Sequence, residues 1–284
     1  MTASTQLALF QASPLVSVPR DTQDLMAYPF FALGKSRRIV PIDFQAGSVR
    51  VRVEGTLEHG IATIWDADIL IWAASQLVDA RDAGQSTSRL MRTTPFEMLT
   101  FMGRGTSSRD YQRLKSALDR LQSTSVATSI RETTGRRLHR FSWINEWKEL
   151  ADISGKPLGL ELVLPDWFYA GVLEQALVLT IDRAYFGLQG GIERWLYRLV
   201  RKHGGRQTGG WQFAFRHLYV KSGSMARYSD FALDIRRIVS RQSLPGYRLA
   251  VRNRSRGEET LAFSPRATGE AQRRPSEDNS EDNL

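Results

Sequence analysis

The chain has 284 residues, of which 42% are hydrophobic, so it is long enough to build two domains of ordinary size. Its net charge of +9 indicates an acidic partner such as nucleic acid. Cysteine is absent, which excludes disulfides, cysteine zinc sites and thiol catalysis. No apolar run approaches the roughly 18 residues of a membrane span, and the start lacks the basic region of a signal peptide. We therefore expect a cytoplasmic protein with no membrane partner.

The first half of the chain predicts a mixture of strands and helices. Residues 1–27 have weak periodicity and are expected to form a flexible N-terminal arm. Paired strands are predicted at 37–44 and at 48–54, and in the second of these valine alternates with charged residues. A buried helix is predicted over 66–77, where Asp66 and Asp68 lie near the start and would stabilise the helix dipole.

A helix-turn-helix pattern follows. Thr94 and Pro95 open one helix, glycines at 103 and 105 indicate a tight turn, and the next helix is predicted over 107–122. That second helix has an apolar stripe and an opposite polar face. The members of the polar face are Arg109, Gln112, Arg113, Ser116 and Arg120. Segments 125–130 and 138–144 then predict a hairpin whose basic residues are Arg131, Arg136 and Arg137.

The second half repeats this plan. Residues 147–157 are expected to connect the halves, with a hinge at 155–157, and helices are predicted at 191–203 and 211–220. The segment 226–263 then predicts a short helix, a Pro-Gly break and a basic hairpin. The helix exposes Ser229, Arg236, Arg237 and Ser240, with Leu233 on the same side. The hairpin carries Arg248, Arg252, Arg254 and Arg256.

The charge of this region distinguishes two interpretations of the helix and hairpin. Between residues 201 and 256 there are 13 Lys or Arg and 2 Asp or Glu, an excess larger than that of the whole chain. An ordinary solvated amphipathic helix beside a hairpin would mix the two signs, because a field of one sign repels itself. The excess favours polyanion binding, with the helix in the major groove and the hairpin along the backbone.

The predicted fold class is therefore α+β, with two tandem winged-helix domains at 28–155 and 156–265. Each would combine a helix-turn-helix with a β-wing. Residues 266–284 are polar and end in an acidic run, so a disordered tail is expected there. In this arrangement the two polar helix faces would read bases, and the hairpin arginines would contact phosphates.

Three apparent motifs lack the context that their chemistry requires. Gly34-Lys35-Ser36 imitates a phosphate-binding loop but lacks its first glycine, and residues 103–108 lack the third glycine of a dinucleotide loop. The histidines at 59, 139, 203 and 217 have neither the helical spacing of a zinc site nor a His-x-His pair. We therefore expect no metal, no cofactor and no catalysis, although a nuclease or strand-transfer enzyme is the alternative of a different class.

Several segments, in order along the chain, resemble the plasmid replication initiator protein A family. They are Ala62-Thr-Ile-Trp-Asp-Ala-Asp-Ile-Leu-Ile-Trp-Ala-Ala-Ser-Gln76, Thr94-Pro-Phe, Tyr111-Gln-Arg-Leu-Lys-Ser-Ala-Leu, Leu164-Pro-Asp-Trp and Gly190-Gly-Ile-Glu-Arg-Trp-Leu-Tyr-Arg. The likeness covers about residues 28 to 264.

The resemblance implies a bacterial plasmid initiator that binds double-stranded origin DNA and helps to open it, commonly with two winged-helix domains. Its implied partners are host replication initiation proteins or a helicase, and it implies no catalytic residues. Such initiators can use the first domain for homodimerisation instead of DNA contact, so both roles stay open for the helix at 107–122. A transcriptional repressor with the same DNA-binding parts is the alternative function.

Overall fold

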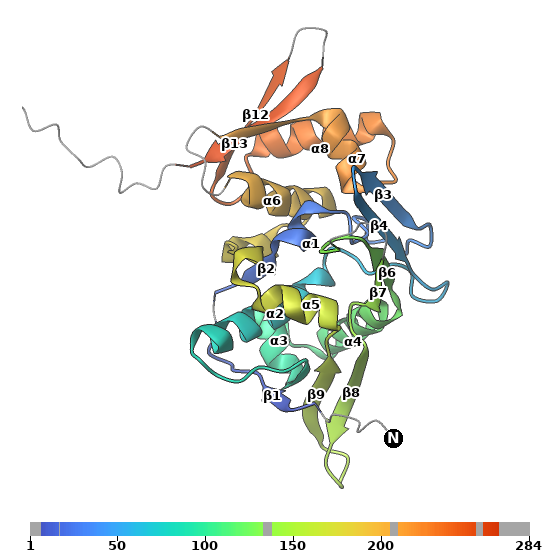
Figure 1. The fold of residues 1–284 in the computed structure, drawn as a ribbon, viewed down its shortest axis with the longest axis vertical. Helices are drawn as coiled ribbons and strands as arrows, with labels where there is room; N and C mark the ends of the chain where they lie inside the picture. Colours follow the sequence, from blue (N-terminus) through green and yellow to red (C-terminus); the bar gives the residue numbers. More distant parts are fainter. Residues whose placement is uncertain (1–6, 17, 133–137, 205–209, 254–257, 267–284) are drawn as a thin grey trace, which may run out of the picture.

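The structure is built on one series of elements that occurs twice: a helix, a strand, two helices and a two-stranded hairpin (Figure 1). It is a computed structural model, and it describes residues 7–16, 18–132, 138–204, 210–253 and 258–266. The first series is α2 (Ala67–Asp82), β5 (Leu90–Thr93), α3 (Pro95–Phe101), α4 (Ser108–Ser123), β8 (Glu146–Ala151) and β9 (Pro157–Val163). The second is α6 (Gly191–Gly204), β11 (Trp211–Ala214), α7 (Phe215–Ser222), α8 (Tyr228–Arg241), β12 (Tyr247–Asn253) and β13 (Glu259–Pro265).

The two series also share a sheet topology. The strands of the first lie in the order β5-β9-β8, and those of the second in the order β11-β13-β12. In both, the strand after the first helix pairs with the last strand of the hairpin. In both helix pairs, a glycine with positive φ, Gly103 or Gly223, follows the first helix and lets the chain turn sharply. The predicted internal repeat is therefore present, although the segments that form it differ from those predicted.

The hairpin predicted from 125 to 144 forms, but it belongs to a separate sheet. β6 (Ser125–Thr128) pairs antiparallel with β7 (His139–Ser142). β6 also pairs with β4 (Val49–Glu54), which in turn pairs with β3 (Ile42–Ala46). The resulting sheet has the order β3-β4-β6-β7; β3 and β4 precede α2 in the chain, and β6 and β7 lie between α4 and the β8–β9 hairpin. The counterpart of the β12–β13 hairpin is thus β8–β9.

The predicted hinge at 155–157 is wrong, because these residues close the β8–β9 hairpin. Asp152 Oδ1 accepts hydrogen bonds from the backbone N–H groups of Ser154 and Lys156, at 2.8 and 2.9 Å. β9 then pairs with both β8 and β5, so the chain stays within the first sheet beyond residue 157. A domain boundary at residue 156 would divide this sheet.

The described part of the N-terminal segment is ordered by packing and pairing, which contradicts the expected flexible arm. β1 (Leu9–Gln11) pairs parallel with β5, and β2 (Arg20–Thr22) pairs antiparallel with β10 (Val178–Thr180). α1 (Gln23–Ala27) buries its last three residues and contacts α6. The chain between β9 and α6 contains α5 (Asp166–Leu173) and the 3₁₀ turns Gln175–Leu177 and Arg183–Gly187. Of the disordered tail predicted at 266–284, residues 267–284 lie outside the described part.

A continuous core runs through both halves of the molecule. α2 is at its centre, since every residue of this helix except Asp79, Arg81 and Asp82 is buried. The helix predicted over 66–77 is therefore confirmed and extends five residues further. The predicted helix over 211–220 is corrected, because Trp211–Ala214 pair with β13 as a strand before the helix begins at Phe215.

Candidate nucleic-acid interface

The α7–α8 pair presents a polar helix face. α8 buries Phe231, Ala232, Ile235 and Ile238, while Val239 is partly buried, as the predicted apolar stripe requires. The opposite side is exposed and carries Ser229, Leu233, Arg236, Arg237 and Ser240. Guanidinium and hydroxyl groups can donate hydrogen bonds to base edges and phosphates. The sequence therefore placed this face correctly, including the apolar Leu233, which is 43% exposed.

Arg236 and Arg237 are neighbours on this face, but their side chains are held differently. Arg236 forms a bidentate ion pair with Glu259 of β13, with Nε–Oε1 2.9 Å and Nη2–Oε2 2.5 Å. This hydrogen bonding lowers the pKa of Glu259, and it joins α8 to the start of β13, next to the turn of the β12–β13 hairpin. Arg237 is more exposed, and its nearest carboxylate, on Asp234, is 3.3 Å away within the same helix. Arg237 is thus the freer of the two cations.

The β12–β13 hairpin carries its described arginines on the face that points away from the helices. Tyr247 and Leu249 are buried toward the helices, while Arg248, Ala250 and Arg252 alternate with them and are exposed. Arg248 pairs in register with Ser264, and Arg252 pairs with Thr260, nearer the hairpin turn. Arg252 is therefore better placed than Arg248 to contact a ligand at the end of the hairpin. Arg254 and Arg256 lie outside the described residues.

The α3–α4 pair presents a similar helix face in the first series. α4 buries Leu114, Ala117, Leu118 and Leu121, and it exposes Arg109, Gln112, Arg113 and Ser116. Arg113 makes one ion pair within the helix, with Asp110 at 3.3 Å, and keeps 62% of its side chain exposed. Four of the five residues predicted for this polar face are thus accessible to solvent.

Arg120, the fifth residue, points inward instead. Its guanidinium makes a bidentate ion pair with Asp66, at 2.8 and 2.7 Å, and Asp66 also accepts from the backbone N–H of Thr63 at 2.7 Å. Hydrogen bonding to Asp66 raises the pKa of Arg120. The interpretation of Arg120 as a free cation on the helix face is therefore wrong. Arg120 lies at the border of the polar face, and its guanidinium turns inward to pair with Asp66.

The Arg131 side chain also makes its contacts inside the fold and does not project from a wing. Its Nε donates to Asp24 at 2.8 Å, its Nη1 donates to the carbonyl of Trp167 at 2.5 Å, and its guanidinium lies 4.1 Å from the Trp167 ring. The side chain passes so close to α5 that a Cβ on Gly171 would lie 2.0 Å from it. Arg131 therefore joins α1, α5 and the β6–β7 connection. Arg136 and Arg137 lie outside the described residues.

The structure also contains buried ion pairs that link the two series to each other and the N-terminal segment to α6. Asp68 of α2 accepts from Arg194 of α6 at 2.8 Å and from Arg104 at 2.7 Å. Asp21 of β2 pairs with Arg198 of α6 at 2.7 Å, and both side chains are almost fully buried. The partners are separated by 126 and 177 residues, so no local spacing reveals them. A charged residue in an otherwise apolar helical stripe, as at 194 and 198, is the sequence signal that could have indicated them.

Two of the apparent motifs lack, within the described residues, a feature of the sites that they imitate. The chain after Lys35 has no regular structure until β3 begins at Ile42, so no helix follows as a phosphate-binding loop requires. No three of the described His, Asp and Glu side chains form a cluster that could hold a metal ion. None of the described helices is both long and apolar enough to span a bilayer.

Comparisons with known proteins agree with the resemblance in the sequence. Residues 20–249 match the sequence model of the replication initiator protein A family. The chain is similar to a protein of Wigglesworthia glossinidia brevipalpis named "Putative replication protein", with 31% identity over 228 residues, covering 79% of this chain and 82% of that one.

Among solved structures, the chain is similar to a crystal structure of domains 2 and 3 of RctB. The TM-score is 0.61 at 16% identity, covering 89% of this chain and 99% of the other. A second crystal structure of these RctB domains gives a TM-score of 0.56 at 14% identity, covering 86% and 97%. At this level of identity the likeness describes the mixed α and β fold.

Proposed function

Since this chain belongs to the replication initiator protein A family, we propose that it binds double-stranded DNA at a plasmid origin and so starts replication. In this proposal the binding is specific for sequence, and the protein acts in the cytoplasm without catalysis of its own. At the origin it would recruit host replication initiation proteins or a helicase. The observation that carries the proposal is the exposed polar face of α8 beside a hairpin rich in arginine.

The proposed architecture is a pair of winged-helix domains, one from each series. Support comes from the order of elements and from the strand order, in which the first strand pairs with the last strand of the hairpin. In this scheme α4 and α8 are the recognition helices, and β8–β9 and β12–β13 are the wings. The first domain then extends to about residue 163 and the second begins near residue 191, later than the boundary at 156 predicted from the sequence.

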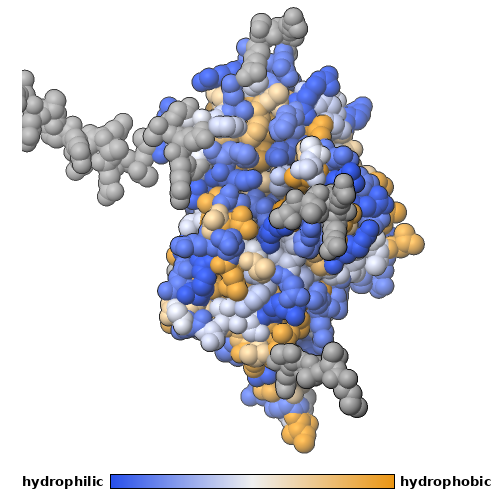
Figure 2. All heavy atoms as spheres, in the orientation of Figure 1, coloured by the Kyte–Doolittle hydropathy of each residue, from blue (hydrophilic) through white to orange (hydrophobic). Residues whose placement is uncertain are grey.

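The two proposed wings differ in chemistry, which suggests different roles. The β8–β9 segment has 4 acids and 2 lysines, whereas residues 247–265 have 4 arginines and 2 acids. At the β8–β9 turn Ile153 is fully exposed and Leu158 is 56% exposed, and Figure 2 shows apolar surface at this end of the molecule. An acidic hairpin with an apolar tip suits contact with protein better than contact with phosphate. We therefore assign DNA contact mainly to the second domain and propose homodimerisation through the first.

The residues proposed to contact DNA fall into two groups. Base contacts are assigned to the exposed helix positions Ser229, Arg236, Arg237 and Ser240, with Arg109, Gln112, Arg113 and Ser116 as a second set. Phosphate contacts are assigned to Arg248, Arg252, Arg254 and Arg256, and to Arg136 and Arg137. Arg120 and Arg131 are omitted because their guanidinium groups are engaged by Asp66 and Asp24.

The test compares three arginine variants on a duplex selected from fragments of the native plasmid. Arg237→Ala should lower the preference for the selected site over random duplex by about 1–3 kcal/mol, the usual size of one bidentate base contact. Arg252→Ala should weaken both duplexes equally and reduce the salt slope by about 0.9, because one phosphate contact is lost. Arg50→Ala, at an exposed position of β4, is the matched control and should change neither quantity.

The outcome of the selection also separates the two functions. Enrichment of repeated sites near the replication origin supports the initiator, whereas enrichment at promoters alone favours a repressor. If Arg237→Ala discriminates between the duplexes as well as the parent does, α8 is not the reading element.

A further inference from the structure

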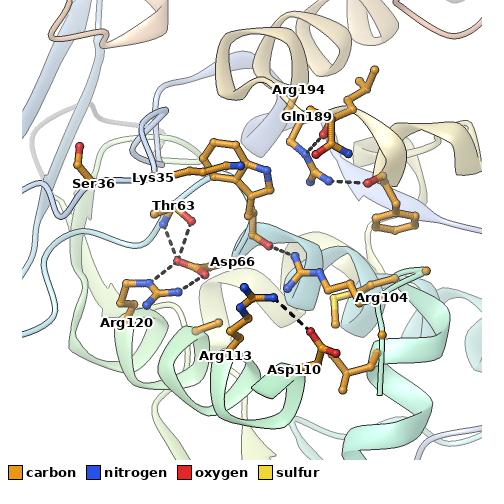
Figure 3. A pocket seen from close by; sticks show the side chains of 18 of the residues that line it. Lys35, Ser36, Thr63, Asp66, Arg104, Asp110, Arg113, Arg120, Gln189 and Arg194 are labelled. Carbon is orange, nitrogen blue, oxygen red and sulfur yellow. Dashed lines mark hydrogen bonds and ion pairs between the residues drawn. The ribbon is translucent and has the colours of Figure 1, made fainter. Parts of the chain in front are cut away.

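A cavity of about 620 Å³ lies between α4, the start of α6 and the segments around residues 35–37 and 59–66 (Figure 3). Its volume is within the range of about 300–1,000 Å³ that is usual for small-molecule sites. The walls come from both series of elements, since Arg113 belongs to α4 and Arg194 to α6. This cavity is distinct from the exposed face of α8 that carries the proposed function, and it shares Arg113 with the exposed face of α4.

The lining of the cavity is strongly cationic. Six lysine or arginine side chains line it, namely Lys35, Arg37, Arg104, Arg113, Arg120 and Arg194, together with His59. The carboxylates that line it belong to Asp66 and Asp110, while Asp68, beneath the wall, pairs with Arg104 and Arg194. The cations therefore outnumber the nearby carboxylates, and the cavity favours an anion.

Part of this wall is rigid, because buried acids and backbone carbonyls hold the guanidinium groups. Arg194 donates to Asp68 at 2.8 Å and to the carbonyls of Leu188 and Phe186, each at 2.8 Å. Arg104 donates to the carbonyl of Trp65 at 2.7 Å as well as to Asp68. Groups held in this way keep their positions when a ligand arrives, so binding need not order them.

Lys35 differs from these arginines. Within the described residues it has no carboxylate at ion-pair distance, and its ammonium lies 5.3 Å from the centre of the Trp65 ring. A cation over an aromatic face is attracted to the ring but keeps its full charge. Arg37 also has no carboxylate at ion-pair distance among the described residues, but it donates to the carbonyl of Glu58 at 3.1 Å, so Lys35 is the cation of the cavity that is most available to an incoming anion.

Trp65 supplies an aromatic surface in the same cavity. It lines the wall, is partly buried, and lies within 6.0 Å of the Arg194 guanidinium. Aromatic side chains stack on nucleobases with little dependence on which base is present. An anion that also carries a base would use both features, since Lys35 could leave the ring for a phosphate and free the ring face for the base.

We propose that this cavity binds a nucleoside polyphosphate, with phosphates at Lys35 and Arg113 and the base on Trp65. The site is not a phosphate-binding loop, because side-chain cations take the place of loop amides. Its occupancy would link α4 with α6 and so couple the two series. The inference goes beyond DNA binding and can be tested with no DNA present.

The experiment measures binding of ATP to the full-length chain by calorimetry in EDTA, with tripolyphosphate and adenosine as separate probes. ATP should bind more tightly than either part. Lys35→Met should weaken ATP binding about tenfold, as expected when one charge-assisted contact is removed. Lys156→Met, in the exposed β8–β9 turn, is the matched control and should bind like the parent. Trp65→Leu should weaken ATP but leave tripolyphosphate unchanged.

Three results would overturn the inference. One is the absence of saturable ATP binding in a parent chain that is folded. A second is equal binding of ATP and tripolyphosphate with equal losses in Lys35→Met and Lys156→Met, which describes a diffuse basic surface. The third is a loss of random-duplex binding in Lys35→Met with no loss of ATP binding, which would make the cavity part of the DNA surface. Thermal unfolding of each variant separates a lost contact from a lost fold.

Discussion

His203 illustrates how the environment of a single residue sets its chemistry. The imidazole lies at the end of α6, stacked near Trp211 at 6.1 Å and edge-on to Phe213 at 5.1 Å. Its Nε2 is buried and has no hydrogen-bond partner. Burial, followed by the positive charges of Lys202, Lys221 and His217, lowers the pKa of His203 to about 4. The neutral form is therefore the one that the fold accommodates.

This environment predicts that stability depends on pH. The unfolded chain, with a histidine pKa near 6.5, binds the proton more readily than the folded chain. The contribution of neutral His203 to the stability of the folded state is complete above about pH 6.5 and is lost as the pH falls toward 4. After allowance for solvent screening we expect a loss of roughly 1–2 kcal/mol from His203 over this window. Urea unfolding at pH 7 and pH 5 measures it, and His203→Gln should have the flatter dependence. Equal slopes for parent and variant would assign the acid sensitivity to other groups.

At the scale of elements, the helices of the two pairs begin in different ways. α3 and α4 each begin with a capping box: Thr94 with Glu97, and Ser107 with Asp110. In each box the hydroxyl accepts from the backbone N–H three residues on, and the carboxylate accepts from the N-cap N–H. α8 begins after Arg227, which makes no side-chain cap hydrogen bond. The start of α4 is therefore defined by local hydrogen bonds, whereas α8 depends more on packing.

The cap of α4 gives a test with a neighbouring control. Ser107→Ala removes the hydroxyl that satisfies a backbone N–H, so the free energy of unfolding should fall by about 1 kcal/mol. Ser108→Ala, one residue later and exposed, removes no cap and should change stability by less than about 0.5 kcal/mol. Chemical denaturation of both variants measures the difference. A loss for Ser108→Ala as large as that for Ser107→Ala would contradict the cap.

The prediction of elements from the sequence succeeded where the pattern was long and failed where pairing decided the result. The apolar stripes of α2, α4 and α8 were predicted from residues spaced three and four apart, and each is buried. Alternation at 125–144 correctly predicted a hairpin but could not show which strands it would join. A hairpin in any sheet has the same period of two, so residues 147–157, which contain β8 of the true counterpart, are predicted as a connector.

At the scale of the whole molecule, buried ion pairs hold the N-terminal segment and the two series together. Asp21 reaches Arg198 of α6 from β2, and Asp68 reaches Arg194 of the same helix from α2. Each charge is taken out of water, and the loss of hydration is offset by its partner and by further hydrogen bonds. Removal of one partner leaves the other buried and uncompensated.

These pairs predict that the N-terminal segment is essential to the stability of the whole chain. Asp21→Ala leaves the buried Arg198 without its partner and should lower the free energy of unfolding by about 3–5 kcal/mol. Arg227→Ala breaks an exposed ion pair with Asp230 and should cost less than about 1 kcal/mol. Urea denaturation compares the two, with proteolysis of the N-terminal segment as a second measurement. A cost for Asp21→Ala no larger than that for Arg227→Ala would mean that this segment is a dispensable arm.

Interactions between residues close together in the chain determine many features of this protein. The net charge, the helical stripes, the glycine turns and the exposed faces of α4 and α8 depend on residues close together in the chain, and the sequence by itself revealed them. The tertiary structure alone decided the pairing of β9 with β5, the burial of Arg198 by Asp21, and the inward turn of Arg120 and Arg131. A long arginine side chain can reach either solvent or a carboxylate far along the chain. The partner that it finds is set by how the elements pack, and no local period records that.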